Sequence, residues 1–213
     1  MPPGPSPTPP APSRPRRGLP GKPHPRVFAF DDAPFRFSQA TTPVVGVVVS
    51  LPGYLEGLLR TEVAVDGDDA TEALLSSVNP SRFRPASQAI LLGGISLAGF
   101  NVVDLARLHQ ETGLPVVTVT REPPDLQAMS GALERRFGAG AAERERRIRS
   151  FPLFPFGSGP RPLWVAGVGL DREGTCSLLA KSLVRGSYPE PLRLAHRIAA
   201  LLAGGRGVPR SRA

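Results

Sequence analysis

Cysteine and long apolar segments are scarce in this chain of 213 residues. A single cysteine, Cys176, excludes an internal disulfide and fits a reducing compartment, so we expect a cytoplasmic protein. No apolar run reaches the ~20 residues that cross a bilayer. The amino terminus also lacks the apolar core of a secretory signal. We therefore expect no membrane partner.

Acidic residues are absent from both ends of the chain. Residues 1–26 carry five basic side chains and no acid, and the last eleven residues carry three basic side chains and no acid. The remainder holds 18 basic and 18 acidic side chains, so the formal charge of +8 lies wholly in the tails. We expect residues 1–25, which are rich in proline and arginine, and residues 204–213 to be disordered around one domain at 26–203.

Several catalytic and metal-binding motifs are also missing. The chain has no Cys/His metal spacing, no G-x-S-x-G and no P-loop match. These absences argue against a structural zinc site, a serine hydrolase of the nucleophile-elbow type and a P-loop nucleotide hydrolase. Chemistry at a site would therefore have to come from other residue types.

The hydrophobic pattern predicts an α/β fold. Strands are expected at 27–30, 43–50 and 55–65, with the second and third antiparallel across a turn near Pro52 and Gly53. Asp69-x-x-Glu72 resembles a capping box at the start of a helix. Further strands are expected at 88–94, 114–120 and 162–169, and helices at 101–113, 123–138, 141–150, 171–184 and 190–204. This order predicts a ribonuclease-H-like mixed sheet, an antiparallel meander followed by parallel strands, with helices on both faces.

Acidic residues cluster after two of these strands. Asp31 and Asp32 end the first strand, and Asp66, Asp68 and Asp69 fill the turn after the third. Carboxylates at strand ends can share Mg²⁺, and two such ions can promote phosphodiester cleavage. Structural roles are equally open, because Asp68 or Asp69 suits a helix N-cap and Asp66-Gly67 is ordinary turn chemistry.

Five segments together resemble the endonuclease dU family: "FDDAPFR", "EGLLRTEVAVDGDDATE", "GGISLAGFNVVDL", "ETGLPVVTVTREPPDL" and "RGSYPEPLRLAHRIA". The resemblance runs from about residue 26 to residue 202. That family is in turn similar to endonuclease V, which has a ribonuclease-H-like fold and cuts nucleic acid near deaminated bases with carboxylate-bound Mg²⁺. The resemblance therefore implies a nuclease of repair type and a nucleic-acid partner with a modified base.

The resemblance also implies roles for individual residues. Asp31 would be one metal ligand and catalytic residue, with Asp69 or Asp66 as the second ligand. Arg121 would reach the scissile phosphate, although pairing with Glu122 or Asp125 is an alternative. The remaining expected contacts with nucleic acid are Phe100, Asn101 and His196; His196 stands where related proteins often have an acid. Phe100 is as well explained as a core aromatic, and Asn101 as the cap of the next helix.

One position departs from the family pattern. Members typically read Asp-Gly at the end of the fourth strand, whereas this chain reads Gly93-Gly94. Binding of Mg²⁺ or Mn²⁺ would be weakened unless Asp32, Asp68, Asp104 or a substrate oxygen compensates. Two hypotheses follow for the domain: a metal-dependent nuclease acting on deaminated or damaged nucleic acid, and a catalytically inactive nucleic-acid-binding protein on the same fold. A third, less favoured, is a structural or protein-partner role with the Pro/Arg-rich tail as the contact.

Overall fold

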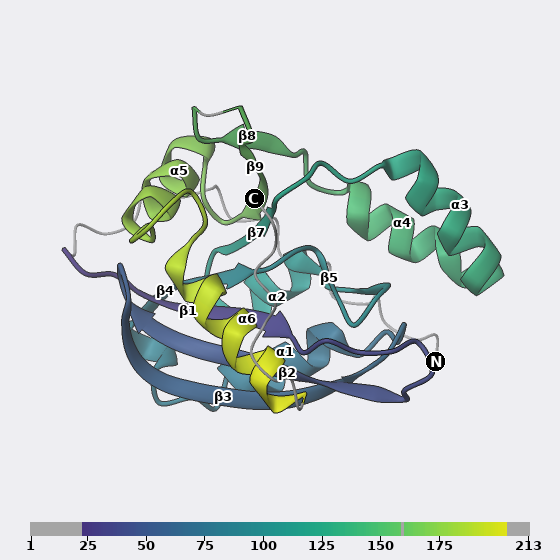
Figure 1. Ribbon diagram of the computed structural model, residues 1–213, viewed down its shortest axis with the longest axis horizontal. Helices are drawn as coiled ribbons and strands as arrows, with labels where there is room; N and C mark the ends of the chain where they lie inside the picture. The colour runs from purple at the N-terminus through teal and green to yellow at the C-terminus, as the bar shows by residue number, and fades with distance from the viewer. Residues whose placement is uncertain (1–22, 159, 204–213) are drawn as a thin grey trace, which may run out of the picture.

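A seven-stranded mixed sheet forms the centre of the molecule (Figure 1). The computed structural model describes residues 23–158 and 160–203. The strands lie in the order β3-β2-β1-β4-β7-β9-β8. Their bounds, in chain order, are β1 Arg26–Asp32, β2 Thr41–Ser50, β3 Tyr54–Ala64, β4 Ser87–Leu92, β7 Val116–Thr120, β8 Phe154–Phe156 and β9 Leu163–Val168.

Strand pairing confirms the predicted ribonuclease-H-like fold class. β1 is antiparallel to β2, with Asp31 opposite Val45, and parallel to β4, and β4 is parallel to β7. The β9–β8 edge of the sheet differs from the expected parallel arrangement. Strand β9 runs antiparallel to β7, and a further strand, β8, pairs with β9. β8 has only three residues, "FPF", which is too short for an alternation to be visible in the sequence.

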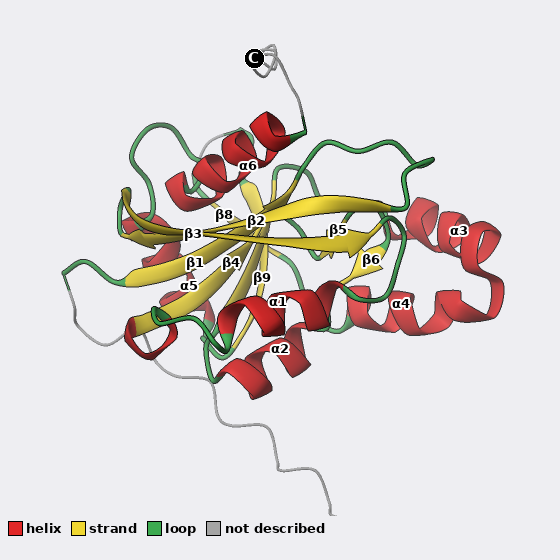
Figure 2. Cartoon of the chain, turned by 90° about the horizontal axis from the view of Figure 1, so that it is seen from below, coloured by secondary structure: helices red, strands yellow, loops and turns green. Residues whose placement is uncertain are grey.

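Helices cover both faces of the sheet, as the sequence predicted. Figure 2 shows α6 on one face and α1 and α2 on the other. The valines of β2 alternate between the two cores: Val45 and Val47 pack toward α6, and Val44 and Val48 pack toward α1. The helices are α1 Ala70–Val78, α2 Leu105–Thr112, α3 Leu126–Phe137, α4 Ala141–Arg149, α5 Arg172–Lys181 and α6 Glu190–Leu202, with short 3₁₀ turns at Arg84–Ala86 and Gly138–Gly140.

Helices α3 and α4 form a hairpin beside the sheet (Figure 1). Its small core joins Leu133, Ala141 and Ile148 to Val102. Val102 belongs to a two-stranded ribbon of β5 Ser96–Leu97 and β6 Asn101–Val102. The hairpin is therefore anchored to the segment that follows β4, which connects it to the carboxyl edge of the sheet.

Two predicted helix starts were wrong. The helix expected from residue 101 begins at Leu105, because the Asp104 side chain accepts a hydrogen bond from the backbone N–H of Arg107. The helix expected from residue 123 begins at Leu126, since Asp125 caps it by accepting from the N–H groups of Gln127 and Ala128. In both cases a capping aspartate sets the boundary.

The predicted disorder of the tails falls almost entirely on residues 1–22 and 204–213, which lie outside the described residues. His24, assigned to the tail from the sequence, places its Nδ1 atom 3.0 Å from the carbonyl oxygen of Leu51. The backbone N–H of Leu51 in turn donates to the carbonyl of Pro25 at 2.9 Å. Within the described part of the chain, no helix has the length and apolarity needed to cross a membrane.

Candidate functional site at the carboxyl end of β1

The Asp31 carboxylate lies at the end of β1 and contacts the last helix. Its Oδ2 atom is 2.9 Å from Nδ1 of His196 on α6, and the two side chains are 13% and 51% exposed respectively. Helix α6 packs against β1 in a shared core, to which it contributes two fully buried small residues, Ala195 and Ala199. The hydrogen bond to Asp31 raises the pKa of His196 above its usual value, so the charged imidazolium is favoured.

Arg121 and Tyr188 complete this cluster. Arg121 directly follows β7, and its Cζ atom lies 4.4 Å from the centroid of the Tyr188 ring, a cation–π geometry. Burial raises the pKa of Tyr188 to about 12, and the neighbouring charge of Asp31 adds to the rise. The structure thus brings together three residues that the sequence nominated: Asp31, Arg121 and His196. Tyr188 was missed; its only signal was its place in the quoted segment "RGSYPEPLRLAHRIA".

Asp32 points to a different partner from its neighbour Asp31. Its Oδ2 atom accepts a hydrogen bond from the backbone N–H of Ala98 at 3.0 Å. Burial, and to a smaller extent the adjacent Asp31 charge, raises the pKa of Asp32 from 3.8 to about 6. Asp32 therefore ties the end of β1 to the segment at 94–100.

Gly93 faces the Asp31 carboxylate. A Cβ atom at Gly93 would lie 3.0 Å from Oδ1 of Asp31, and the backbone N–H of Gly93 donates to the carbonyl of Phe30 at 3.3 Å. A carboxylate at this position would therefore stand beside Asp31, as the endonuclease dU resemblance implies. In this chain β4 contributes no such group.

Asp66 is engaged by protein groups. It is one of two non-glycine residues with positive φ among the described residues, at 57°, and its side chain is 5% exposed. Its Oδ1 atom accepts from the N–H of Phe100 at 2.8 Å, and its Oδ2 atom accepts from Nε of Arg136 at 2.6 Å. Both carboxylate oxygens therefore already have donors, one of which is a cation.

Asp69 is likewise held within the protein. Its Oδ1 atom accepts from Nδ2 of Asn101 at 2.6 Å and from the N–H of Ala64 at 3.1 Å. The predicted capping box was wrong: Asn101 Oδ1 accepts from the N–H of Ala70, and Glu72 pairs with Arg107 at 2.7 Å. Asn101 therefore caps α1, a helix other than the one expected, and it is fully buried.

The other nominated residues also have structural partners. Asp68 pairs with Arg147 of α4 at 2.6 Å. Phe100 is half-buried and meets Phe137 of the hairpin edge-on, with ring centroids 6.1 Å apart. Phe100 thus packs as an aromatic of the small hairpin core, which was the alternative to its predicted contact with nucleic acid.

These contacts bear on the predicted Mg²⁺ or Mn²⁺ site. Among the described residues, no three His, Cys, Asp or Glu side chains converge to hold a metal ion. Asp31 is paired with His196, Asp66 with Arg136 and Asp69 with Asn101. The three carboxylates, as placed, do not fit a centre in which Asp31, Asp66 and Asp69 share one metal ion. The metal-binding role of these residues therefore stays a prediction.

The order and pairing of the strands define an α/β protein with a ribonuclease-H-like fold. A solved structure of Ciona intestinalis endonuclease V, in complex with a 24mer DNA containing an inosine followed by a ribo-adenosine, shares this fold. Its TM-score is 0.53 at 14% identity, with 81% of this chain and 83% of that chain covered.

The chain belongs to the endonuclease dU family, whose model matches residues 23–203. A UPF0215 protein of Thermococcus kodakarensis is 44% identical over 188 residues, which cover 86% of this chain and 95% of the relative. The crystal structure of a protein of unknown function from Archaeoglobus fulgidus is 34% identical with a TM-score of 0.77 and covers 85% of this chain and 99% of that chain. The family resemblance inferred from the motifs is therefore confirmed.

Proposed function

We propose that this protein binds nucleic acid at the end of β1 through cationic side chains, and that this binding needs no divalent metal. One observation carries the proposal. The Asp31 carboxylate is paired with His196 and faces Gly93, so the position that would complete a carboxylate cluster has no side chain. The groups that the site offers to a phosphate are the side chains of Arg121 and His196.

In this proposal the residues of the cluster have distinct tasks. Arg121 is exposed, and the Tyr188 ring beneath its guanidinium limits the conformations it must give up on binding. His196 is half-exposed, and Asp31 favours its protonated form, so it can donate a charge-assisted hydrogen bond from Nε2 to a phosphate oxygen. Backbone contacts of this kind position a strand without reading its sequence.

The family and the shared fold support nucleic acid as the ligand. The family carries the description endonuclease dU, and the Ciona endonuclease V of similar fold was solved with an inosine-containing DNA. Nucleic acid with a deaminated or otherwise modified base is therefore the ligand class to test first.

A second candidate function is a Mg²⁺- or Mn²⁺-dependent nuclease acting on deaminated or damaged nucleic acid. It is favoured by the family description and by two adjacent acids, Asp31 and Asp32, at the end of a central strand. Asp66 and Asp69 could act as the predicted metal ligands only if the ion pair of Asp66 with Arg136 and the hydrogen bonds of Asp69 to Asn101 and Ala64 were rearranged. Arg121 would then contact the scissile phosphate.

The two functions separate in one experiment. Fluorescence polarisation of the full chain should show binding to uracil- and hypoxanthine-containing strands that is unchanged by EDTA. Arg121→Ala should weaken this binding. The control Arg60→Ala should not, because Arg60 is a 61% exposed arginine on outer strand β3 and pairs there with Glu62. Cleavage by the wild type in Mg²⁺ or Mn²⁺ that is abolished by Asp31→Asn would establish the nuclease instead. The absence of binding to every strand would overturn both.

A further inference from the structure

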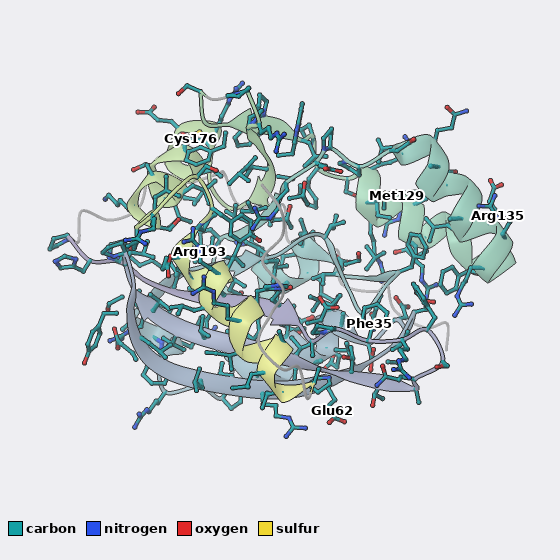
Figure 3. All side chains as sticks on the ribbon, viewed as in Figure 1. Phe35, Glu62, Met129, Arg135, Cys176 and Arg193 are labelled. Carbon is teal, nitrogen blue, oxygen red and sulfur yellow. The ribbon has the colours of Figure 1, made fainter. Side chains whose placement is uncertain are left out.

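An exposed aromatic side chain lies at the same edge of the sheet, outside the cluster described above. Phe37 belongs to the loop at 33–40 between β1 and β2, and 66% of it is exposed. The loop is closed by Gln39, whose Oε1 accepts from the N–H of Arg36 at 2.6 Å and whose N–H donates to the Arg36 carbonyl. Phe35, labelled in Figure 3, meets Phe37 edge-on with ring centroids 5.5 Å apart. The Phe37 ring is therefore supported from within its own loop.

Two other segments meet Phe37. Its Cε1 atom lies 3.4 Å from the place where a Cβ of Gly99 would be, and Gly99 has a φ of +89°, so the ring rests against bare backbone. The Cζ atom of Arg136, on α3, is 5.9 Å from the ring centroid. An aromatic face and a half-exposed guanidinium thus stand side by side at the carboxyl edge.

Asp66 fixes the position of this guanidinium. Arg136 is 50% exposed, yet its Nε atom is held at 2.6 Å by the buried Asp66 carboxylate. Pairing through Nε uses one of the five N–H donors of the guanidinium, so the four on the terminal nitrogens are not needed for this contact. Asp66 itself is locked by the N–H of Phe100. The acid predicted to be a metal ligand therefore holds an arginine beside Phe37.

We propose that Phe37 is a stacking platform for an unpaired nucleobase, with Arg136 beside it to bind the adjacent phosphate. The inference deepens the proposed nucleic-acid-binding function and rests on it. Single exposed aromatics are ordinary on protein surfaces. Phe37, however, is supported by Phe35 and Gly99 and lies beside the guanidinium of Arg136. It also follows β1, the strand that carries Asp31 at its end. Single-strand binding surfaces combine an aromatic side chain with a neighbouring cation in this way. Phe37 takes the role that the sequence assigned to the half-buried Phe100.

The test compares a short single-stranded oligonucleotide with the same strand carrying abasic sites. Stacking is a contact with the base alone, so base removal and Phe37→Ala should remove the same interaction. Phe37→Ala should raise the Kd for the base-bearing strand by about tenfold or more, and base removal should weaken the wild type but not the variant. Phe37→Trp should retain binding, and the control Leu58→Ala, which trims a 55% exposed apolar residue on β3, should leave the Kd unchanged.

The outcomes distinguish this inference from the function on which it rests. If the wild type binds neither strand, the proposed function fails. If the wild type binds but Phe37→Ala binds as well as it does, or loses equal affinity for base-bearing and abasic strands, stacking is refuted and the wider proposal stands. Circular dichroism checks the fold of each variant. Phe37→Leu, which keeps an apolar contact for Phe35 but has no π face, decides the question if the alanine variant unfolds.

Discussion

Restoring an acid at Gly93 tests the central feature of the site. Gly93→Asp places a carboxylate against Asp31, because the new Cβ lies 3.0 Å from the Asp31 Oδ1 atom. The backbone at Gly93 is not in the left-handed region, so the side chain adds no φ penalty there. Gly93→Asn is the matched control, since it has the same shape and the same close contact without the charge.

The size of the charge effect follows from the distance. Two carboxylates about 4 Å apart repel by about 1 kcal/mol in water and about 4 kcal/mol at an effective dielectric constant near 20. Asp31 is only 13% exposed, which favours the upper part of this range, and the charged His196 beside it offsets a share. At pH 7 without metal, Gly93→Asp should therefore unfold with a free energy about 1 to 4 kcal/mol below that of Gly93→Asn.

Urea denaturation of both variants, with and without Mg²⁺, measures this difference. The difference in unfolding free energy between Gly93→Asp and Gly93→Asn should narrow at pH 4, where one carboxyl takes up a proton. It should also narrow in Mg²⁺, because a cation shared by two carboxylates stabilises the folded state by RT ln(1 + [Mg²⁺]/Kd). A concentration of ten times Kd corresponds to about 1.4 kcal/mol. Equal stability of the two variants at pH 7 in EDTA would refute the placement of Gly93 against Asp31.

Three further results are expected. The unfolding free energy of the wild type should fall by about 3 kcal/mol between pH 4 and pH 6, and Asp32→Asn should abolish this fall. The pKa of Asp32 is raised to about 6, so the folded state favours the protonated acid and stability is lost as pH rises through that value. Parallel curves of unfolding free energy against pH for wild type and variant would contradict this. His196→Ala should flatten the pH dependence of nucleic-acid binding above about pH 6.5, because the wild type loses its imidazolium as pH rises through the raised pKa of His196. Fluorescence polarisation titrations at several pH values measure this dependence. An unaltered pH profile would count against a contact between His196 and a phosphate. Asn101→Ala should lower the unfolding free energy by about 3 kcal/mol, since the fully buried Asn101 side chain makes hydrogen bonds to Ala64, Asp69 and Ala70. A loss below about 1 kcal/mol in urea denaturation would show that other donors and acceptors replace these hydrogen bonds.

Local patterns predicted most of the fold. The continuous valine run of β2 requires a strand buried on both faces, and the pattern of strands then helices limits the topology to a meander followed by crossovers. The motifs identified the endonuclease dU family, and they placed Asp31 and His196 in segments that do meet. Helix starts were less predictable. Asn101 is also a suitable cap upstream of Asp104, and Pro123 and Pro124 suit a first helical turn upstream of Asp125.

The partner of each acid, in contrast, depends on segments far apart in the chain. Asp66 pairs with Arg136, 70 residues away, and Asp69 with Asn101, 32 residues away, so no local pattern could assign these carboxylates to protein donors instead of a metal. Spacing gives a residue its place on a strand or turn, which is a property of the neighbouring backbone. Whether its charge is free or neutralised depends on which distant side chains the packing of α3, α6 and the 94–100 segment brings within hydrogen-bonding distance.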